Sequence, residues 1–254
     1  DEAHCISDWG HDFRPDYRRI ADVLTSLPPD VPVLAATATA NDRVTHDVAE
    51  QIGARAHTFR GSLDRPSLHL GVVSLASSGE RLAWLAGWVR ARSGPGIVYA
   101  LTVSEVERIA SFLVACGLSA AAYSGATDAA ARAAIEDDLD QGRLDCVVAT
   151  SALGMGYDNS RLAYVVHIGS PSSPVSYYQQ VGRAGRGTSA AEVVLCPTPT
   201  DGDVWAYFDS TAMPPRHVVD EVLTVLQRGG PASIADIEAG VNLRRGRLEV
   251  LLKI

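Results

Sequence analysis

Short apolar runs alternate along the chain with stretches that repeat their apolar residues at helical spacing. The apolar runs, which we expect to be strands, lie at 31–37, 68–74, 96–101, 119–123, 145–150, 163–168 and 191–196. The helical stretches lie between them, near 42–52, 79–92, 103–116, 128–141 and 174–184. Apolar runs without polar alternation indicate strands buried on both faces, which is typical of a parallel sheet covered by helices. The pattern therefore predicts an α/β fold built from strand–helix–strand units.

Two segments depart from this alternation. The segment "FRGSLDRPSLH" at 59–69 contains a glycine and a proline, and we interpret it as a linker between two α/β units. After Pro197 helical patterns dominate, and "ASIADIEAGVNLRRGRLEVLLKI" at 232–254 predicts two short helices around Gly240. That spacing is typical of a helix-turn-helix.

Composition narrows the class of protein. The 254 residues are 46% hydrophobic and 20% charged, which is typical of a globular protein with one large or two medium cores. No apolar run approaches the ~20 residues that cross a bilayer. The net charge of −8 is unfavourable for nucleic-acid binding, but a local basic patch can override it. The four cysteines form no C-x-x-C pair, so we expect reduced thiols, a cytoplasmic protein and no zinc.

Candidate chemistry begins with "DEAH" at 1–4. Asp1 could hold Mg²⁺ through water, and Glu2 could orient or deprotonate an attacking water. Four residues alone also fit an ordinary capped helix start. The segment "AATATA" at 35–40 ends an expected strand with the hydroxyls of Thr37 and Thr39, although such a segment is also typical of a turn.

Two later segments could bind phosphate. In "QQVGRAGR" at 179–186, Arg183 and Arg186 share a face if the segment is helical, and the glycines beside them allow close approach to a triphosphate. The alternative is a solvated basic helix, which the glycines oppose because they weaken helices. The segment "VVATSALGMGYDNS" leaves a strand for a glycine-rich turn. Its phosphate-binding candidates are Thr150 and Ser151, and Asp158 could accept from a ribose hydroxyl.

An aromatic loop follows the acids directly. Trp9 and Phe13 offer flat faces on which unpaired bases can stack, and Arg14 can reach back toward a nucleotide. The alternative, that these aromatics belong to a core, is weakened by the polar neighbours, which include His11.

In this order the segments resemble the motifs of RecQ-type DNA helicases of superfamily 2. "DEAHCISDWGHDFRPDYRRI" resembles motif II with the aromatic-rich loop, and "LAATATA" resembles motif III. "SLDRPSL" resembles the interlobe segment, and "GIVYALTVSEVERIASFL" resembles motif IV. "VVATSALGMGYDNS" resembles motif V, and "SYYQQVGRAGR" resembles motif VI. The resemblance covers residues 1 to about 208.

The resemblance implies four regions. They are the C-terminal part of a first RecA-like lobe, an interlobe linker with the first strand, a complete second RecA-like lobe with a parallel sheet, and a helical tail that begins a winged helix. The expected bounds of these regions are 1–60, 61–75, 76–208 and 209–254.

The resemblance also implies roles for individual residues. Asp1 would bind Mg²⁺ through water, Glu2 would be the catalytic base, and Arg183 and Arg186 would be arginine fingers. ATP binding would also use Asp158 and Gln179. The residues that would couple ATP to DNA are His4, Thr37, Thr39 and Arg14. The implied DNA contacts are Trp9, His11, Phe13, Thr102, Thr150 and Ser151, with Arg244, Arg245 and Arg247 as candidates in the tail.

The chain also departs from the family pattern. It contains no GxxxxGK[ST] P-loop, and we interpret it as a fragment cut upstream of motif II. The zinc module that follows motif VI in the family is absent. Single residues that differ from the pattern are Val103, Ser124, Asn159, Ser160 and Gln180. We expect these changes to affect DNA affinity and stepping more than ATP hydrolysis.

The sequence therefore predicts part of an ATP- and Mg²⁺-dependent, 3′-to-5′ helicase that translocates on single-stranded DNA and unwinds partially duplex DNA. By resemblance it would work in DNA repair and recombination, in the cytoplasm at the nucleoid. Two alternatives remain open at this point: an RNA helicase, and a RecA-like DNA-binding scaffold that no longer hydrolyses ATP.

Overall fold

The chain forms two compact units. The structure, a computed structural model, describes residues 2–6, 19–28, 31–39, 41–53, 56–62, 64–153, 157–187, 190–212, 216–229, 232–241, 243 and 245–252. One unit is Gly61–Gly202, called the sheet unit below. The other comprises Asp1–Arg60 and Asp203–Ile254.

The sheet unit is built on one six-stranded sheet. Its strands are β1 (Leu68–Val72), β2 (Gly96–Ala100), β3 (Ala120–Tyr123), β4 (Cys146–Ala149), β5 (Tyr164–Ile168) and β6 (Ala191–Cys196). Their order is β1-β6-β5-β2-β4-β3, and every pairing is parallel. The strands β2, β4 and β5 are buried over their whole length, which explains their lack of polar alternation. The six strands expected after residue 61 and the parallel α/β fold are confirmed.

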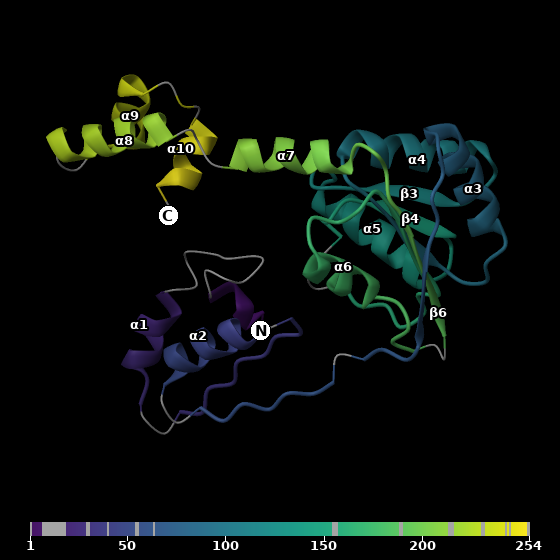
Figure 1. Cartoon of the computed structure of the whole chain (residues 1–254), viewed down its shortest axis with the longest axis horizontal. Helices are drawn as coiled ribbons and strands as arrows, with labels where there is room; N and C mark the ends of the chain where they lie inside the picture. Colours follow the sequence, from purple (N-terminus) through teal and green to yellow (C-terminus); the bar gives the residue numbers. More distant parts are fainter. Residues whose placement is uncertain are drawn as a thin grey trace. The chain divides into compact units, whose positions relative to one another are not determined.

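Four helices cover the two faces of this sheet. They are α3 (Ser78–Arg90), α4 (Val103–Ala115), α5 (Ala129–Asp140) and α6 (Pro174–Val181). The helices α3 and α4 lie on one face, and α5 and α6 lie on the other (Figure 1). Each of the four begins at a Ser, Thr or Asp whose side chain accepts a hydrogen bond from the first helical turn.

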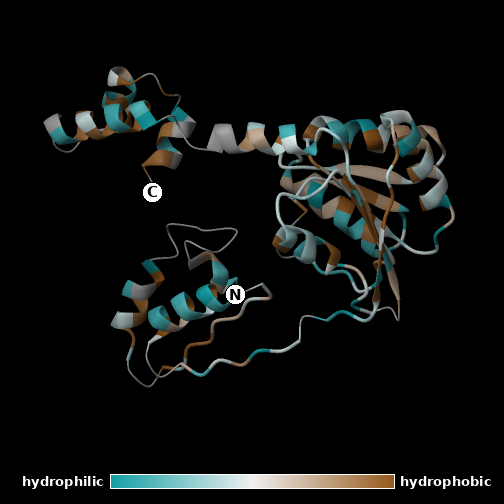
Figure 2. Cartoon of the chain, in the orientation of Figure 1, coloured by the Kyte–Doolittle hydropathy of each residue, from teal (hydrophilic) through white to brown (hydrophobic). Residues whose placement is uncertain are grey.

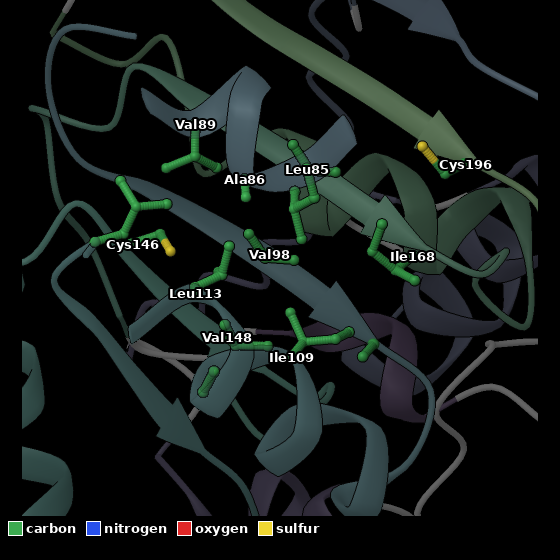
Figure 3. Packing of buried hydrophobic residues seen from close by; sticks show 14 of the residues in the cluster. Leu85, Ala86, Val89, Val98, Ile109, Leu113, Cys146, Val148, Ile168 and Cys196 are labelled. Carbon is green, nitrogen blue, oxygen red and sulfur yellow. The ribbon is translucent and has the colours of Figure 1, made fainter. Parts of the chain in front are cut away.

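The core under α3 and α4 is mainly aliphatic, with Tyr164 and two cysteines among its buried residues. Leu85 of α3 and Leu113 of α4 are fully buried and point toward Val98 and Val148 of the sheet (Figure 3). Hydrophobic colouring is concentrated on the strands, whereas the covering helices also carry hydrophilic positions (Figure 2). This division is what a helix packed with one face on a sheet requires.

The cysteines of the sheet unit behave as small apolar residues. Burial raises the pKa of Cys146 to about 12 and that of Cys196 to about 11, so both remain thiols at neutral pH. Within the described residues, Cys116, Cys146 and Cys196 form no disulfide.

The N-terminal part of the other unit contains a 3₁₀ turn η1 (Ala3–Ile6) and the helices α1 (Arg19–Ser26) and α2 (Asp42–Ile52). The strand expected at 31–37 is wrong: the described backbone there is extended but joins no sheet. Val33 and Leu34 are exposed, because a strand needs a neighbouring strand to pair with and to bury its side chains.

The C-terminal part is helical. It contains α7 (Asp201–Ala212), which starts in the sheet unit, then α8 (Arg216–Gly229), α9 (Ile234–Gly240) and α10 (Arg245–Leu251). Val222 of α8 packs with Ile237 and Leu248 in a small core of its own. The two short helices around Gly240 are confirmed, and the winged helix stays a prediction. In the described part of the chain, no helix combines the length and the apolar character that a membrane span needs.

Candidate functional site

The residues of motifs II and III meet within the segment Asp1–Arg60. His4 is 1% exposed, and its Nδ1 lies 2.9 Å from Thr37 Oγ1 and 3.5 Å from Thr39 Oγ1. The same nitrogen lies 3.2 Å from Glu2 Oε2. A buried imidazole nitrogen thus links the carboxylate of motif II with the hydroxyls of motif III. A shift of either segment changes the surroundings of the other.

Glu2 has an unusual backbone. Its φ is 53°, in the left-handed region that costs a residue with a Cβ roughly 1 kcal/mol or more. The flanking groups hold it there: the Ala3 N–H donates to Ala36 O at 3.0 Å, and the Cys5 N–H donates to Glu2 O at 3.0 Å. Strain of this kind is typical of a side chain that must point in one direction, and the Glu2 side chain remains 29% exposed.

Motifs V and VI meet in the sheet unit through Arg186. Its Nη1 lies 2.8 Å from Asp158 Oδ1, and its Nε donates to Gly182 O at 3.0 Å. The side chains of Arg186 and Asp158 are 42% and 69% exposed. An ion pair this exposed contributes about 0–1 kcal/mol, so a polyanion can displace Asp158 at little cost.

Arg183 lies in a different environment from Arg186. It is 8% exposed, and its Nη1 donates to Tyr157 O at 2.9 Å. It also lies beside Tyr99, whose pKa burial raises to about 12 while the guanidinium partly opposes the rise. Its Nε is buried and has no hydrogen-bond partner in the described part of the chain.

The helical face expected for the two arginines is therefore wrong. The helix α6 ends at Val181, and the arginines follow in a turn around Gly182 and Gly185. Gly182 caps the helix, and Gly185 further along the turn has a φ of 70°, which glycine adopts readily because it has no Cβ. The alternative of a solvated basic helix is equally excluded for the buried Arg183.

A buried histidine beside this turn was not among the sequence candidates. His167 of β5 is 1% exposed, and its Nε2 lies 2.8 Å from Gln180 Oε1. Its ring stacks on Tyr99 at a centroid distance of 5.2 Å. Burial lowers the pKa of His167 to about 4, so the ring is neutral at pH 7 and donates to the amide oxygen. The signal in the sequence is a polar residue inside the apolar run at 163–168.

The turn of motif V is anchored to α5. Asn159 Nδ2 donates to Asp140 Oδ1 at 2.8 Å, and the Tyr157 hydroxyl donates to the same oxygen at 2.9 Å. The Arg161 N–H donates to Asn159 Oδ1 at 2.7 Å. Asn159 departs from the family pattern, and its 6% exposure shows that it serves this network rather than the surface.

The remaining candidates in the sheet unit make local contacts. Thr102 caps α4 by accepting from the Glu105 N–H at 3.2 Å. Thr150 Oγ1 accepts from the Ala152 N–H at 3.3 Å, and Ser151 is exposed beside it. Gln179 lies on α6 and is partly buried. Their roles toward DNA and ATP stay predictions.

Several candidates lie outside the described residues. They are Asp1, Trp9, His11, Phe13, Arg14 and Arg244, together with the side chain of Arg247. In the tail, Arg245 Nε lies 3.0 Å from Glu249 Oε1 on an exposed surface of α10.

Within the described ranges, no three His, Cys, Asp or Glu side chains lie close enough together to hold a metal ion. The Mg²⁺ ligand expected from the sequence, Asp1, is outside those ranges. Both Mg²⁺ and the absence of zinc stay predictions.

Comparison with known proteins gives consistent results. A family model described as "Helicase conserved C-terminal domain" matches residues 80–188. The chain is 40% identical over 203 residues to the ATP-dependent DNA helicase RecQ of Haemophilus influenzae, which covers 79% of this chain and 32% of that protein. It is 32% identical over 231 residues to the probable ATP-dependent DNA helicase RecS of Bacillus subtilis, covering 90% of this chain and 46% of that protein.

Solved structures agree on the fold. Dbp5 of S. cerevisiae, bound to RNA and ADP BeF3, matches with a TM-score of 0.64 and 19% identity, covering 82% of this chain and 55% of that one. The helicase Lhr of Mycobacterium smegmatis, bound to ssDNA and AMP-PNP, matches with a TM-score of 0.51 and 23% identity, covering 82% of this chain and 32% of that one. At such identities the likeness concerns the fold alone. The chain spans less than half the length of the two curated relatives above.

Proposed function

Because the chain belongs to the RecQ family of helicases, we propose that it carries motifs II to VI of an ATP-dependent DNA helicase. In that proposal a P-loop segment, which this sequence does not contain, completes the ATP site. We call the polypeptide with both parts the complete helicase. It translocates 3′ to 5′ on single-stranded DNA, unwinds partially duplex DNA, and works in the cytoplasm at the nucleoid.

The observation that carries the proposal is the convergence of motifs V and VI on two guanidinium groups. Arg186 is exposed, and its Nη1 forms a weak pair with Asp158 while its Nε donates to Gly182 O, so the Nη1 end can transfer to a phosphate. Arg183 is buried in the same turn, where its Nη1 donates to Tyr157 O of motif V at 2.9 Å. Guanidinium groups stabilise the charge that develops on a transferred γ-phosphoryl group.

The second part of the proposed chemistry is the attack of water. We assign the general base to Glu2, whose strained backbone fixes its direction, and the Mg²⁺ ligand to Asp1, acting through water. The metal, when bound, neutralises charge on the phosphates. His4 connects Glu2 to the hydroxyls of Thr37 and Thr39, which supports a role in transmitting the state of the nucleotide.

The test is ATP turnover by the complete helicase with single-stranded DNA, with RNA and with neither. For Arg186→Ala we expect a loss of about 10³-fold or more in kcat, the scale of an arginine finger. Arg143→Ala is the matched control, because Arg143 forms an exposed pair with Asp138 at 2.6 Å that involves none of the motifs. It should keep normal turnover.

Three outcomes would contradict the proposal. Stimulation by RNA but not by DNA would favour an RNA helicase. Turnover too low to measure, with DNA binding intact, would favour a non-hydrolytic scaffold. Normal turnover by Arg186→Ala would remove the assignment of the arginine finger.

A further inference from the structure

The chain that leads into β1 is bonded to the backbone of the arginine turn. Arg65 Nη1 donates to Gly182 O at 3.4 Å, and Arg65 Nη2 donates to Ala184 O at 3.2 Å. Ser67 Oγ donates to Gly185 O at 3.0 Å. Arg65, Pro66 and Ser67, called the 65–67 clamp below, thus hold three of the carbonyls between the end of α6 and Arg186.

The 65–67 clamp and Arg186 share an acceptor. The carbonyl of Gly182 receives the Arg186 Nε at 3.0 Å and the Arg65 Nη1 at 3.4 Å. A carbonyl oxygen has two lone pairs, so both donors can be accommodated. The direction of that carbonyl therefore sets where the guanidinium of Arg186 lies, and Arg65 fixes that direction with its planar fork.

Gly185 leaves room for the clamp, whereas a side chain at Gly182 would meet it only in ordinary van der Waals contact. A Cβ on Gly185 would lie 2.7 Å from Ser67 Oγ and 3.0 Å from Leu68 Cδ2, and a Cβ on Gly182 would lie 3.6 Å from Arg65 Nη1. The sequence suggested that the glycines leave space for a triphosphate. At Gly185, Ser67 occupies that space. The close approach brings the clamp within hydrogen-bond reach of the turn.

The clamp itself is fixed at its other side. The Leu68 N–H donates to Arg65 O at 2.9 Å, and the Ala191 N–H donates to Ser67 O at 2.7 Å, where β1 begins to pair with β6. The donors of the clamp are therefore held by the edge of the sheet. A displacement of the turn has to break bonds to a rigid element.

From this geometry we propose that Arg65 and Ser67 are positioning residues for Arg186. They hold the backbone of residues 182–185 in the conformation that presents the Arg186 guanidinium to the nucleotide. This inference rests on the proposed function of Arg186, and neither clamp residue touches the reacting atoms.

The first test measures the turn directly, in this chain and without ATP. Hydrogen–deuterium exchange should become faster at residues 182–186 in Arg65→Ala, because the amides of this turn lose their anchored carbonyl neighbours. Exchange in β2 should stay unchanged. Arg81→Ala is the matched control, since Arg81 Nη1 donates to Leu75 O at 3.2 Å in the same unit. Unchanged exchange at 182–186 in Arg65→Ala would overturn the clamp.

The second test is steady-state ATP turnover by the complete helicase. For Arg65→Ala we expect kcat to fall about 10-fold or more, with the KM for ATP and the affinity for DNA within about 3-fold, because a misplaced group is lost mainly from the transition state. Arg65→Lys should recover part of kcat, since a lysine supplies one of the two bonds. Arg81→Ala should keep its kcat.

The double variant separates positioning from general destabilisation. If Arg65 acts through Arg186, Arg65→Ala should cost less than about 2-fold when Arg186 is already Ala, because the two effects are not additive. Additive losses, or an unchanged kcat in Arg65→Ala while Arg186→Ala is impaired, would overturn the inference. Normal turnover in Arg186→Ala would instead overturn the proposed function and leave the exchange test of the clamp standing.

Discussion

At the scale of single residues, the two arginines of motif VI differ although the sequence treats them alike. Arg186 is exposed and pairs with a carboxylate, whereas Arg183 is buried and donates to the backbone of motif V. The spacing of three residues predicts equivalence only if the segment is helical. Because the helix ends at Val181, the two side chains enter different environments.

Arg183→Ala in the complete helicase should therefore have two effects. Turnover should fall by about 10³-fold or more if Arg183 acts on the γ-phosphoryl group. The melting temperature should also fall, because Tyr157 O loses a charged donor, a change of about 1–3 kcal/mol in the free energy of unfolding. DNA affinity should change little. If DNA binding collapses while turnover survives, Arg183 instead contacts the nucleic-acid backbone.

His167 gives a pH-dependent prediction. Its folded pKa of about 4 lies below the unfolded value of 6.5, so the unfolded state binds more protons between these values. The stabilisation is complete above pH 6.5 and is lost as the pH falls toward 4, by up to about 3 kcal/mol. The ring contacts Tyr99, Tyr177 and Gln180.

NMR titration of the imidazole signals checks this. In the wild-type chain, His167 should titrate near pH 4. Gln180→Glu should raise the pKa of His167, because a carboxylate at the same position favours the imidazolium. A His167 that titrates near 6.5 in the folded wild-type chain would contradict its burial.

At the scale of elements, the periodicity of apolar residues predicted the positions of the strands and helices of the sheet unit. Every strand and helix of the sheet unit was found near its expected position, because each buries its own apolar residues against the same sheet. The segment 31–37 was wrong for the same reason: its apolar residues have no neighbouring strand among the described residues. The sequence predicted the motifs that carry the candidate site, but it did not predict the contacts between these motifs. Nothing in the local sequence shows that Arg65 bonds to Gly182 or that Asp140 anchors Asn159.

The aromatic loop at 9–14 lies outside the described residues. Its proposed role in coupling DNA binding to ATP hydrolysis can be tested by substitutions within the loop. Trp9→Ala or Phe13→Ala in the complete helicase should keep basal ATPase, lose most DNA stimulation and abolish unwinding. Base stacking is worth about 1–3 kcal/mol per base, so affinity for single strands should also fall. Arg14→Lys should act similarly, because lysine lacks the planar fork. The measurement is ATPase rate against DNA concentration, with thermal melting as the folding control. Wild-type stimulation in a well-folded Phe13→Ala protein would exclude the coupling role.

At the scale of the whole molecule, the proposed ATP site needs residues of this chain together with a P-loop, and the sequence of this chain contains no P-loop. The 254 residues alone should therefore show no measurable ATP hydrolysis, even with DNA and Mg²⁺. Radiolabelled phosphate release provides the required sensitivity, and the complete helicase is the positive control. Robust turnover by the chain alone would mean that a phosphate cradle exists among these residues.

The position of β1 at the edge of the sheet also has a consequence for synthesis on the ribosome. The strand pairs with β6, although almost the whole sheet unit separates Leu68 from Ala191 in the sequence. During translation β1 leaves the exit tunnel before the other strands of this sheet and must wait for β6, with which it pairs, until nearly the entire unit has emerged. Contacts between distant parts of a chain form slowly because a long loop must close. The 65–67 clamp, which precedes β1 directly, can then engage the arginine turn only after β6 has arrived. In the nascent chain, the anchoring of the arginine turn is therefore among the last steps to be completed.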